Sequence, residues 1–353
     1  MISGFKKNIL LADHTTIDLG GEAEYFIECK NIDEILSALK FTTEKCIRTQ
    51  IISGGSNVIF ADSGFNGAVI KIDTKGIKFV DEGEIVYAHV QAGENWDEFV
   101  SLCVENNLQG IECMSGIPGS AGATVVQNVG AYGQEVRETI VSVKAIEKDS
   151  LKEISFTNID CKFEYRSSVF KNEKKDKYII TEVIFRLKKN AEAVIRYKEL
   201  QDLVDKKFHE FKDPKDKLIA IRNSVLALRK AKSMLVDKSD PNSRSCGSFF
   251  LNPLLSEEEF KVVQMKTRHE GKELPFYRND SLYKISAAWL VEHAGFHKGF
   301  RFNDGVGISE NHSLAIISTG GSSADVVLFA ESIRKKVKEM FGVTLTIEPV
   351  ILI

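Results

Sequence analysis

The sequence predicts an α+β protein that is too long for one ordinary hydrophobic core. Its 353 residues suggest about two or three domains. Short runs in which apolar and polar residues alternate, typical of half-buried strands, recur as far as Leu187. Longer stretches with apolar residues at helical spacing follow Asp213-Pro214. This change of pattern places a domain boundary near Asp213.

Each element is predicted from its own pattern. Strands are expected within 8–29 and at 48–52, 68–72, 77–80, 85–90, 139–147, 153–157, 178–187 and 344–353. The three runs between 68 and 90 suggest a β-meander. Helices are expected at 31–39, 95–106, 217–233, from 256 onward, at 286–294 and at 322–341. Asn31 and Ser322 stand where N-caps are preferred.

Composition and charge exclude several classes of protein. The chain is 43% hydrophobic and 27% charged, as in soluble globular proteins, and its net charge of −3 gives no case for nucleic-acid or membrane binding. No apolar run approaches the ~18 residues of a membrane span, and no leader peptide is recognisable. Six cysteines without a Cys-x-x-Cys pair favour free thiols in the cytoplasm. Gly295 between His293 and His297 argues against a helical metal pair, so no metal is expected.

The stretch 114–136 is unusually rich in glycine. Gly116, Gly119 and Gly122 form one cluster, and Gly130 and Gly133 form a second one after the strand-like or buried run 123–129. Glycine permits positive φ and close approach of the backbone, so two such turns can aim free N–H groups at a pyrophosphate. The pattern is neither Gly-x-Gly-x-x-Gly nor a Walker loop. The glycines alone leave open the alternative of two hairpin turns in a β-rich domain.

A second loop of this kind is Ser53-Gly54-Gly55-Ser56-Asn57, which follows a predicted strand. It is either a backbone-rich binding loop or a plain turn.

Three polar residues stand in surroundings that leave a functional and a structural role open. Ser248 lies between a glycine and two phenylalanines, where a hydroxyl could donate a proton in a dry pocket, although a lone serine more commonly caps a backbone amide. Arg166 lies in an aromatic stretch, which favours pairing with a carboxylate or phosphate. Glu348 interrupts an apolar C-terminal strand and is either exposed on an edge or buried for a functional reason.

Six motifs in fixed order make the chain resemble the UDP-N-acetylenolpyruvoylglucosamine reductase family along nearly its whole length. They are His14-Thr15-Thr16 with Gly20-Gly21, the loop 53–57, the stretch 116–136, Tyr165-Arg166-Ser167-Ser168-Val169-Phe170, Gly247-Ser248-Phe249-Phe250-Leu251-Asn252-Pro253, and Ile347-Glu348-Pro349. Tyr197, in Arg196-Tyr197-Lys198-Glu199-Leu200, matches the tyrosine loop of the type I form of the family, which closes over the nucleotide.

The resemblance implies a FAD-binding fold of the PCMH, or vanillyl-alcohol-oxidase-like, type. It would consist of two α+β subdomains, residues 1–70 and 71–215, and a smaller α+β substrate-binding domain, residues 216–339. Residues 340–353 would return to the FAD-binding part as a C-terminal strand.

The implied function is NADPH-dependent reduction of UDP-N-acetylenolpyruvoylglucosamine to UDP-N-acetylmuramate through noncovalent FAD. This step belongs to peptidoglycan precursor synthesis, and hence to cell wall biogenesis, cell shape and cell division. A cytoplasmic monomer acting on a UDP-sugar is expected. Two alternatives remain: a flavin oxidase of the same fold acting on another small molecule, and a flavin-free binding protein.

The resemblance also implies roles for individual residues. Ser248 would be the proton donor, and Arg166 and Glu348 would stabilise the charge that develops on the substrate. The residues implied for FAD are Ser53, Gly54, Gly55, Ser56, Asn57, Ser115, Gly116, Ile117, Pro118, Gly119, Gly122, Ala123, Gln127, Asn128, Gly130, Ala131, Tyr132 and Gly133. The residues implied for the UDP-sugar are Tyr197, Lys232, Asn252 and Lys284. The segment between Lys232 and Gly247 is longer than the compact version in some members.

Overall fold

The computed structural model describes residues 4–206, 213–269, 273–279 and 281–353, and the chain divides into two compact units. The first unit comprises Met1–Ile9, Ala23–Gly54 and Asn66–Ala231. The second comprises Leu10–Glu22, Gly55–Phe65 and Lys232–Ile353. The chain therefore crosses into the second unit three times, and residues 214–231 belong to the first. The finer division into 1–70, 71–215 and 216–339 stays a prediction.

The first unit contains a four-stranded sheet. Its strand order is β1 (Phe5–Leu10), β2 (Glu22–Cys29), β5 (Phe65–Ile72) and β3 (Thr49–Ile52), with β3 parallel to β5. Helix α1 (Ile32–Glu44) begins as predicted, because the Asn31 side chain accepts a hydrogen bond from the N–H of Glu34 at 3.0 Å.

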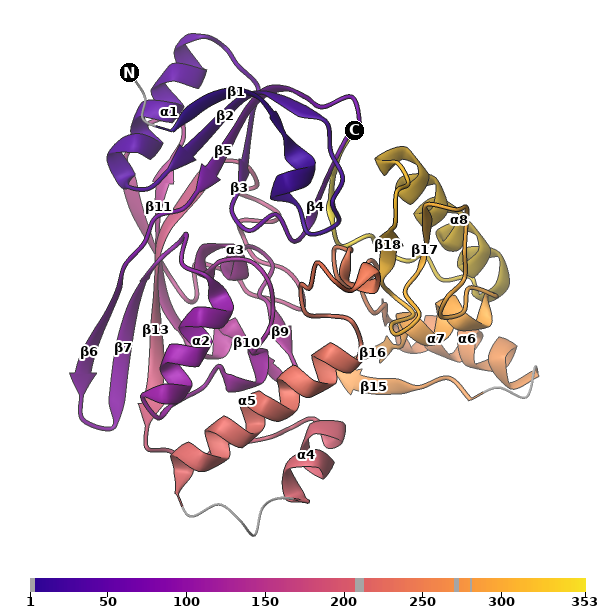
Figure 1. Ribbon diagram of the computed structural model, residues 1–353. Helices are drawn as coiled ribbons and strands as arrows, with labels where there is room; N and C mark the ends of the chain where they lie inside the picture. Colours follow the sequence, from indigo (N-terminus) through magenta and orange to yellow (C-terminus); the bar gives the residue numbers. More distant parts are fainter. Residues whose placement is uncertain (1–3, 207–212, 270–272, 280) are drawn as a thin grey trace. The chain divides into compact units, whose positions relative to one another are not determined.

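A six-stranded sheet in the same unit is larger than the first one (Figure 1). Its order is β12 (Glu153–Thr157), β11 (Ile140–Glu147), β13 (Tyr178–Lys189), β7 (Ile85–Gln91) and β6 (Ile77–Glu82), and β8 (Leu108–Gln109) also pairs with β13. The predicted meander is wrong in one strand, because β5 belongs to the other sheet and only β6 and β7 form a hairpin. Alternation shows which face of a strand is buried, but not which strand is its partner.

The core of this unit is tied directly to the glycine stretch. Trp96 and Phe99 of helix α2 (Trp96–Glu105) pack with Phe185 of β13 at ring-centroid distances of 5.8 and 5.2 Å. The indole N–H of Trp96 donates to the carbonyl of Met114 at 3.0 Å. The chain that enters the glycine stretch is thus held against the most buried part of the unit.

The run 123–129 is a helix in its first part, not a strand. Helix α3 (Ala121–Val126) begins at Ser120, whose hydroxyl accepts from the N–H of Ala123. A Cβ at Gly122 would lie 2.6 Å from the Ala92 side chain, so glycine lets the helix pack closely. The β-branched residues Thr124 to Val126 suggested a strand, but the serine cap and this close packing outweigh their preference.

Helices α4 (Lys198–Asp205) and α5 (Pro214–Ala231) also belong to the first unit. Helix α4 follows Tyr197, and α5 packs against α2 and α4 (Figure 1). Leu218, Ile221 and Val225 form the buried face of α5, as the helical spacing predicts.

In the described residues of the second unit, short strands form three small sheets, and three helices are longer than a single 3-10 turn. The sheets are β14 (Leu254–Leu255), β16 (Leu282–Ile285) and β15 (Phe276–Asn279); β17 (Val306–Ile308) and β18 (Ile316–Ser318); and β19 (Val350–Leu352) and β4 (Val58–Phe60). The helices are α6 (Glu257–His269), α7 (Ala287–His293) and α8 (Ser323–Phe341). Ser322 caps α8 in a capping box with Asp325, as its position predicts.

The C-terminal strand returns to the first part of the sequence, as predicted. Val350 is registered with Val58 in a parallel pair. The strand is shorter than predicted, because Thr346 to Glu348 instead lie beside 249–251: the N–H of Leu251 donates to Thr346 O at 3.0 Å.

Among the described residues, no helix combines the length and the apolar character needed to cross a membrane.

Candidate active site

Two glycine turns of the first unit lie in contact. A Cβ at Gly54 would lie 2.6 Å from the Cα of Gly119, so only glycine allows this approach. In the part of the chain that the structure describes, no group accepts a hydrogen bond from the amides of Gly54, Ile117 or Gly119. Unpaired N–H groups on two touching turns are the elements of an anion-binding nest.

Several other amides of the stretch are engaged within the protein, which corrects the expectation that both turns leave theirs free. The N–H of Gly116 donates to Asp97 Oδ1 at 2.6 Å, and that of Gly122 donates to Ala92 O at 2.9 Å. A ligand would meet fewer amides than the number of glycines suggests.

The second glycine cluster is a hairpin. Strands β9 (Gly130–Ala131) and β10 (Gln134–Glu135) flank Tyr132 and Gly133, whose φ angles are 47° and 84°. Positive φ at both central residues defines a type I′ turn. Of the two glycine clusters, only this second one is therefore the hairpin turn that the sequence left open as an alternative. The Tyr132 ring meets Tyr197 edge to face at 5.3 Å, which brings a predicted cofactor contact beside a predicted substrate contact.

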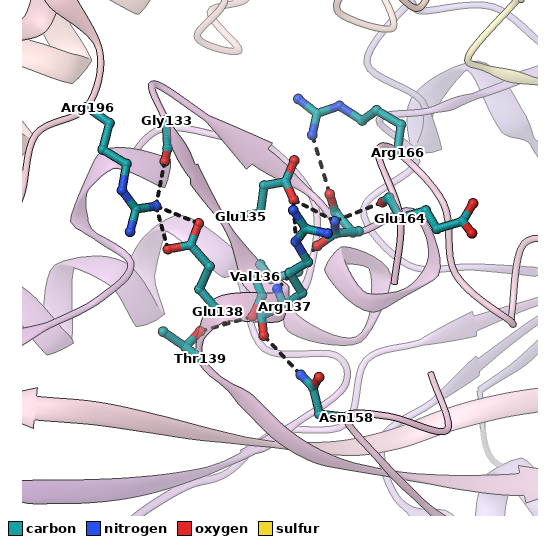
Figure 2. Close-up of polar contacts among 11 residues, drawn as sticks. Gly133, Glu135, Val136, Arg137, Glu138, Thr139, Asn158, Glu164, Arg166 and Arg196 are labelled. Carbon is teal, nitrogen blue, oxygen red and sulfur yellow. Dashed lines mark hydrogen bonds and ion pairs between the residues drawn. The ribbon is translucent and has the colours of Figure 1, made fainter. Parts of the chain in front are cut away.

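Arg196 anchors the segment that carries Tyr197 to this hairpin (Figure 2). Its guanidinium donates to both carboxylate oxygens of Glu138, at 2.8 and 2.9 Å, and to Gly133 O at 3.2 Å. A Cβ at Gly133 would approach the Arg196 side chain to 2.9 Å. The absence of a side chain at position 133 therefore allows Arg196 to pack there.

A charge cluster holds the first glycine turn against α5. The Asp97 carboxylate accepts from both terminal nitrogens of Arg222, at 2.6 and 2.9 Å, as well as from the N–H of Gly116. Arg229 donates to Gly116 O at 3.1 Å. Burial is the largest single influence and raises the pKa of Asp97, but the Arg222 and Gly116 hydrogen bonds and the arginine charges together hold that pKa below its ordinary value.

A second carboxylate lies fully buried at the start of the glycine stretch. Glu112 accepts from the N–H of Gly110 at 2.7 Å and from the Gln134 amide at 2.9 Å. The same Gln134 side chain accepts from the N–H of Cys113 at 2.8 Å. Burial raises the pKa of Glu112, against the effect of these hydrogen bonds.

Arg166 lies at the tip of a tight turn in the first unit. Glu164 and Ser167 exchange backbone hydrogen bonds of 3.1 and 3.2 Å across the turn, and Arg166 has φ 53°. Its guanidinium donates to the carbonyls of Asn128, at 3.3 Å, and Gly130. Figure 2 shows this side chain reaching back to the backbone that leads into the hairpin.

The second unit brings Ser248 and Glu348 onto neighbouring segments. The N–H of Glu348 donates to Phe249 O at 3.0 Å, and Phe250 forms a bridge with Ile347. Both Ser248 and Glu348 are half-buried. Within the described residues, the Ser248 hydroxyl has no hydrogen-bond partner, so it does not act as a turn cap.

Residues of the loop 53–57 belong to both units. In the first, the Ser53 hydroxyl donates to Ile72 O at 2.9 Å. In the second, Gly55 has φ 61°, and a Cβ there would lie 1.8 Å from His14 O. Asn57 meets the C-terminal segment: its carbonyl accepts from Val350 N–H at 3.0 Å, and its amide donates to Glu348 O at 3.5 Å.

Two predicted substrate contacts lie on adjacent segments of the second unit. Lys284 on β16 is registered with Leu254, two residues beyond Asn252. The Asn252 side-chain oxygen accepts from the N–H of Ala287, the first residue of α7, at 2.9 Å. Lys232 is half-buried at the start of this unit, and Tyr197 is 36% exposed in the first.

The structure thus gathers the predicted residues into two sets. Arg166, Tyr197 and the stretch 115–133 lie in the first unit, and Ser248, Glu348, Lys232, Asn252 and Lys284 lie in the second. The described residues contain no cluster of three His, Cys, Asp or Glu suited to a metal.

Sequence reasoning missed the residues that support these sets, chiefly Asp97, Glu112 and Arg222. Asp97 looked like an ordinary acidic residue in the first turn of a helix. Only Glu112, a carboxylate between Ile111 and Cys113, gave a signal in the sequence.

Comparison with known proteins adds a relationship along the whole chain. A model of the C-terminal domain of UDP-N-acetylenolpyruvoylglucosamine reductase matches residues 240–352, and a FAD binding domain model matches residues 23–151. The proteins named UDP-N-acetylenolpyruvoylglucosamine reductase from Thermobifida fusca and Flavobacterium johnsoniae are 38% and 35% identical to this chain. The alignments cover 100% and 97% of this chain, and 99% and 98% of those proteins.

A solved structure shares the fold. The crystal structure of the Thermus caldophilus protein of the same name superimposes with a TM-score of 0.66 at 21% identity, covering 98% of both chains. Together with the FAD binding domain match, it confirms the predicted α+β, PCMH-type FAD-binding fold.

Proposed function

This chain belongs to the UDP-N-acetylenolpyruvoylglucosamine reductase family, and we propose that it converts UDP-N-acetylenolpyruvoylglucosamine to UDP-N-acetylmuramate with FAD and NADPH. The observation that carries the proposal, beyond the family, is the placement of Ser248 beside Glu348. These two residues, one hundred positions apart, lie on hydrogen-bonded segments, and the serine hydroxyl has no partner in the described chain. The family assignment favours the reductase over a flavin oxidase of the same fold.

The touching turns at Gly54 and Gly119 fit the pyrophosphate of FAD. The turns present unpaired N–H groups, and the space that a Cβ at Gly54 would fill is already occupied by backbone. FAD, when bound, supplies the chemistry of accepting hydride from NADPH and passing it to the substrate. The chain's own contribution here is to bind and orient the cofactor.

The substrate is a vinyl ether that bears a carboxylate. Hydride addition at its β-carbon forces negative charge into the carboxylate, and an unstabilised dianionic enolate would be strongly basic. Arg166 is suited to meet that charge with two N–H groups of its fork. Glu348 would help to hold the same intermediate, as a protonated or hydrogen-bonded carboxyl.

Ser248 would deliver a proton to the α-carbon. A serine hydroxyl is a weak acid, but an enolate is a base strong enough to take its proton. The reaction is then balanced: the C=C bond gains one hydride at the β-carbon and one proton at the α-carbon. The flavin site must accept nicotinamide and the enolpyruvyl group in turn, which implies a ping-pong cycle.

Four residues would contact the UDP-sugar: Tyr197, Lys232, Asn252 and Lys284. Lys232 and Lys284 offer positive charge to the pyrophosphate, and Asn252 keeps its amide nitrogen for a ligand because its oxygen is bound to the N–H of Ala287. Tyr197 presents a ring beside Tyr132. The protein would act as a cytoplasmic monomer in peptidoglycan precursor synthesis, and light scattering of the purified protein would check the monomer.

The test separates the two half-reactions through Ser248→Ala, which removes one hydroxyl. Reduction of bound FAD by NADPH should stay within roughly tenfold of wild type, because it needs no proton from this serine. Reoxidation by UDP-N-acetylenolpyruvoylglucosamine should slow on the order of 10²-fold, the scale of a lost general acid. Stopped-flow absorbance follows both steps.

Ser239→Ala is the matched control. It also removes a hydroxyl from the second unit, but that hydroxyl binds Asp237 in the 237–245 loop, so neither step should change. Equal slowing of both steps in Ser248→Ala would mean that Ser248 shapes the pocket. Unchanged rates would reject its role as the proton donor.

A further inference from the structure

Arg166 depends on its surroundings for its position. A non-glycine residue in the left-handed region costs about 1 to 2 kcal/mol, so such a conformation persists only where neighbouring groups hold it. Arg166 has φ 53° in a turn closed by Glu164 and Ser167. Its guanidinium binds two carbonyl oxygens, and within the described residues no carboxylate pairs with it. The side chain is therefore oriented while its charge stays available to an anion.

Asn128 contacts both the Arg166 side chain and the turn that carries Arg166. Its backbone carbonyl accepts from the guanidinium at 3.3 Å, and its side-chain amide donates to Glu164 O, which closes the turn, at 2.9 Å. One residue thus fixes the base of the turn and the tip of the arginine. Asn128 itself is fully buried, so its side chain has no surface to offer a ligand directly.

The remaining bonds of Asn128 hold it rigidly. Its amide also donates to Glu135 Oε2 at 2.9 Å, and its side-chain oxygen accepts from Arg137 N–H at 3.2 Å. Glu135 is in turn paired with the Arg137 guanidinium at 2.8 Å (Figure 2). Asn128 has φ 44°, which asparagine tolerates better than most residues. An aspartate of the same shape would keep that tolerance but would lack both N–H donors.

We propose that Asn128 is the positioning residue for Arg166, acting through the Glu164–Ser167 turn and the guanidinium. The inference rests on the proposed role of Arg166 in stabilising charge on the enolpyruvyl group. It assigns Asn128 a function in one half-reaction only, since reduction of the flavin by NADPH does not require that stabilisation.

The test is Asn128→Asp, followed by stopped-flow absorbance on the FAD-loaded protein. Reoxidation by UDP-N-acetylenolpyruvoylglucosamine should slow by about 10- to 100-fold, the effect of a small misplacement of a charge-stabilising group. Reduction by NADPH should stay within about threefold of wild type on the same basis. Asn128→Gly also accepts a positive φ and also lacks the side-chain hydrogen bonds, so it should slow the same half-reaction. It replaces Asn128→Asp in the test if the aspartate variant does not fold.

Two further variants make the test specific. Asn158→Asp is the matched control, because the Asn158 amide also donates two hydrogen bonds, in its case to the carbonyls of Arg137 (Figure 2) and Ile140, and neither acceptor belongs to the Arg166 turn. It should leave both half-reactions unchanged. Combining Asn128→Asp with Glu135→Gln exchanges donor and acceptor in one hydrogen bond and should recover part of the lost reoxidation rate.

Arg166→Met separates failure of this inference from failure of the proposed function. If Arg166→Met leaves reoxidation unchanged, the proposed role of Arg166 is wrong. If Arg166→Met slows reoxidation but Asn128→Asp does not, or Asn128→Asp slows both steps equally, only the positioning role is overturned. Asn128→Asp added to Arg166→Met should cause no further slowing, because the two residues act in series.

Discussion

Replacing Asp97 with asparagine removes the charge that holds helix α5 to the Gly116 turn. Arg222 is only 14% exposed, and the carboxylate meets both of its terminal nitrogens as well as a backbone N–H. An asparagine offers one acceptor oxygen and turns an NH₂ group toward the guanidinium. The substitution therefore leaves a largely buried arginine without its counter-charge.

The expected loss of stability follows from that geometry. Breaking a fully buried ion pair by removing one partner costs about 3 to 5 kcal/mol. Asp97 is 33% exposed, so the cost here should be smaller. We expect a loss of about 2 to 3 kcal/mol in the free energy of unfolding. Loosening of Gly116 should also raise the dissociation constant of FAD roughly tenfold.

Urea unfolding of the flavin-free protein and fluorescence titration with FAD measure the two effects. Asp81→Asn is the matched control, because Asp81 also accepts from a cation, Lys189, and from the N–H of Gly83 but is exposed to solvent, so its substitution should leave the free energy of unfolding nearly unchanged. Asp97 has a lowered pKa, so its stabilisation is present above about pH 4 and is lost as the pH falls through the folded pKa. As the pH falls, Asp97→Asn should therefore lose less stability than the wild-type protein does. If Asp97→Asn proved as stable as Asp81→Asn at neutral pH, the reasoning would be refuted.

Two other substitutions test the glycine stretch. Gly54→Ala places a Cβ 2.6 Å from Gly119 Cα and should weaken FAD binding at least about tenfold in a fluorescence titration, whereas Gly83→Ala, with nothing within 4 Å, should not; equal affinities would contradict the contact. Because the pKa of Glu112 is raised in the folded state, the contribution of Glu112 to wild-type stability is fully present below the unfolded pKa of about 4.5. That contribution declines as the pH rises through the folded pKa. Urea unfolding at pH 5 and pH 8 should therefore show a smaller decline for Glu112→Gln, and an unchanged decline would place the carboxyl elsewhere.

The sequence by itself determined the helix caps, the buried face of a helix and the protein family, because these depend on local interactions and on the order of motifs. The caps at Asn31 and Ser322 were predictable because a cap forms with an amide only three residues away. The buried face of α5 followed from its spacing. The family, and with it FAD and the reaction, followed from six ordered motifs, because each motif keeps a backbone shape or a chemical group that the reaction needs.

Only the tertiary structure decided which groups meet across long separations. Asn57 and Glu348 are 291 positions apart, and no local pattern records their contact. The sequence could not show that Asp97 accepts the Gly116 N–H, or that Asn128 binds both the Arg166 guanidinium and the turn that carries Arg166. Glycine and asparagine permit unusual backbone angles, but their partners are supplied by other segments. The physical reason is that hydrogen bonds and charge pairs depend on final positions in space, whereas helical spacing, alternation and caps act within a few residues.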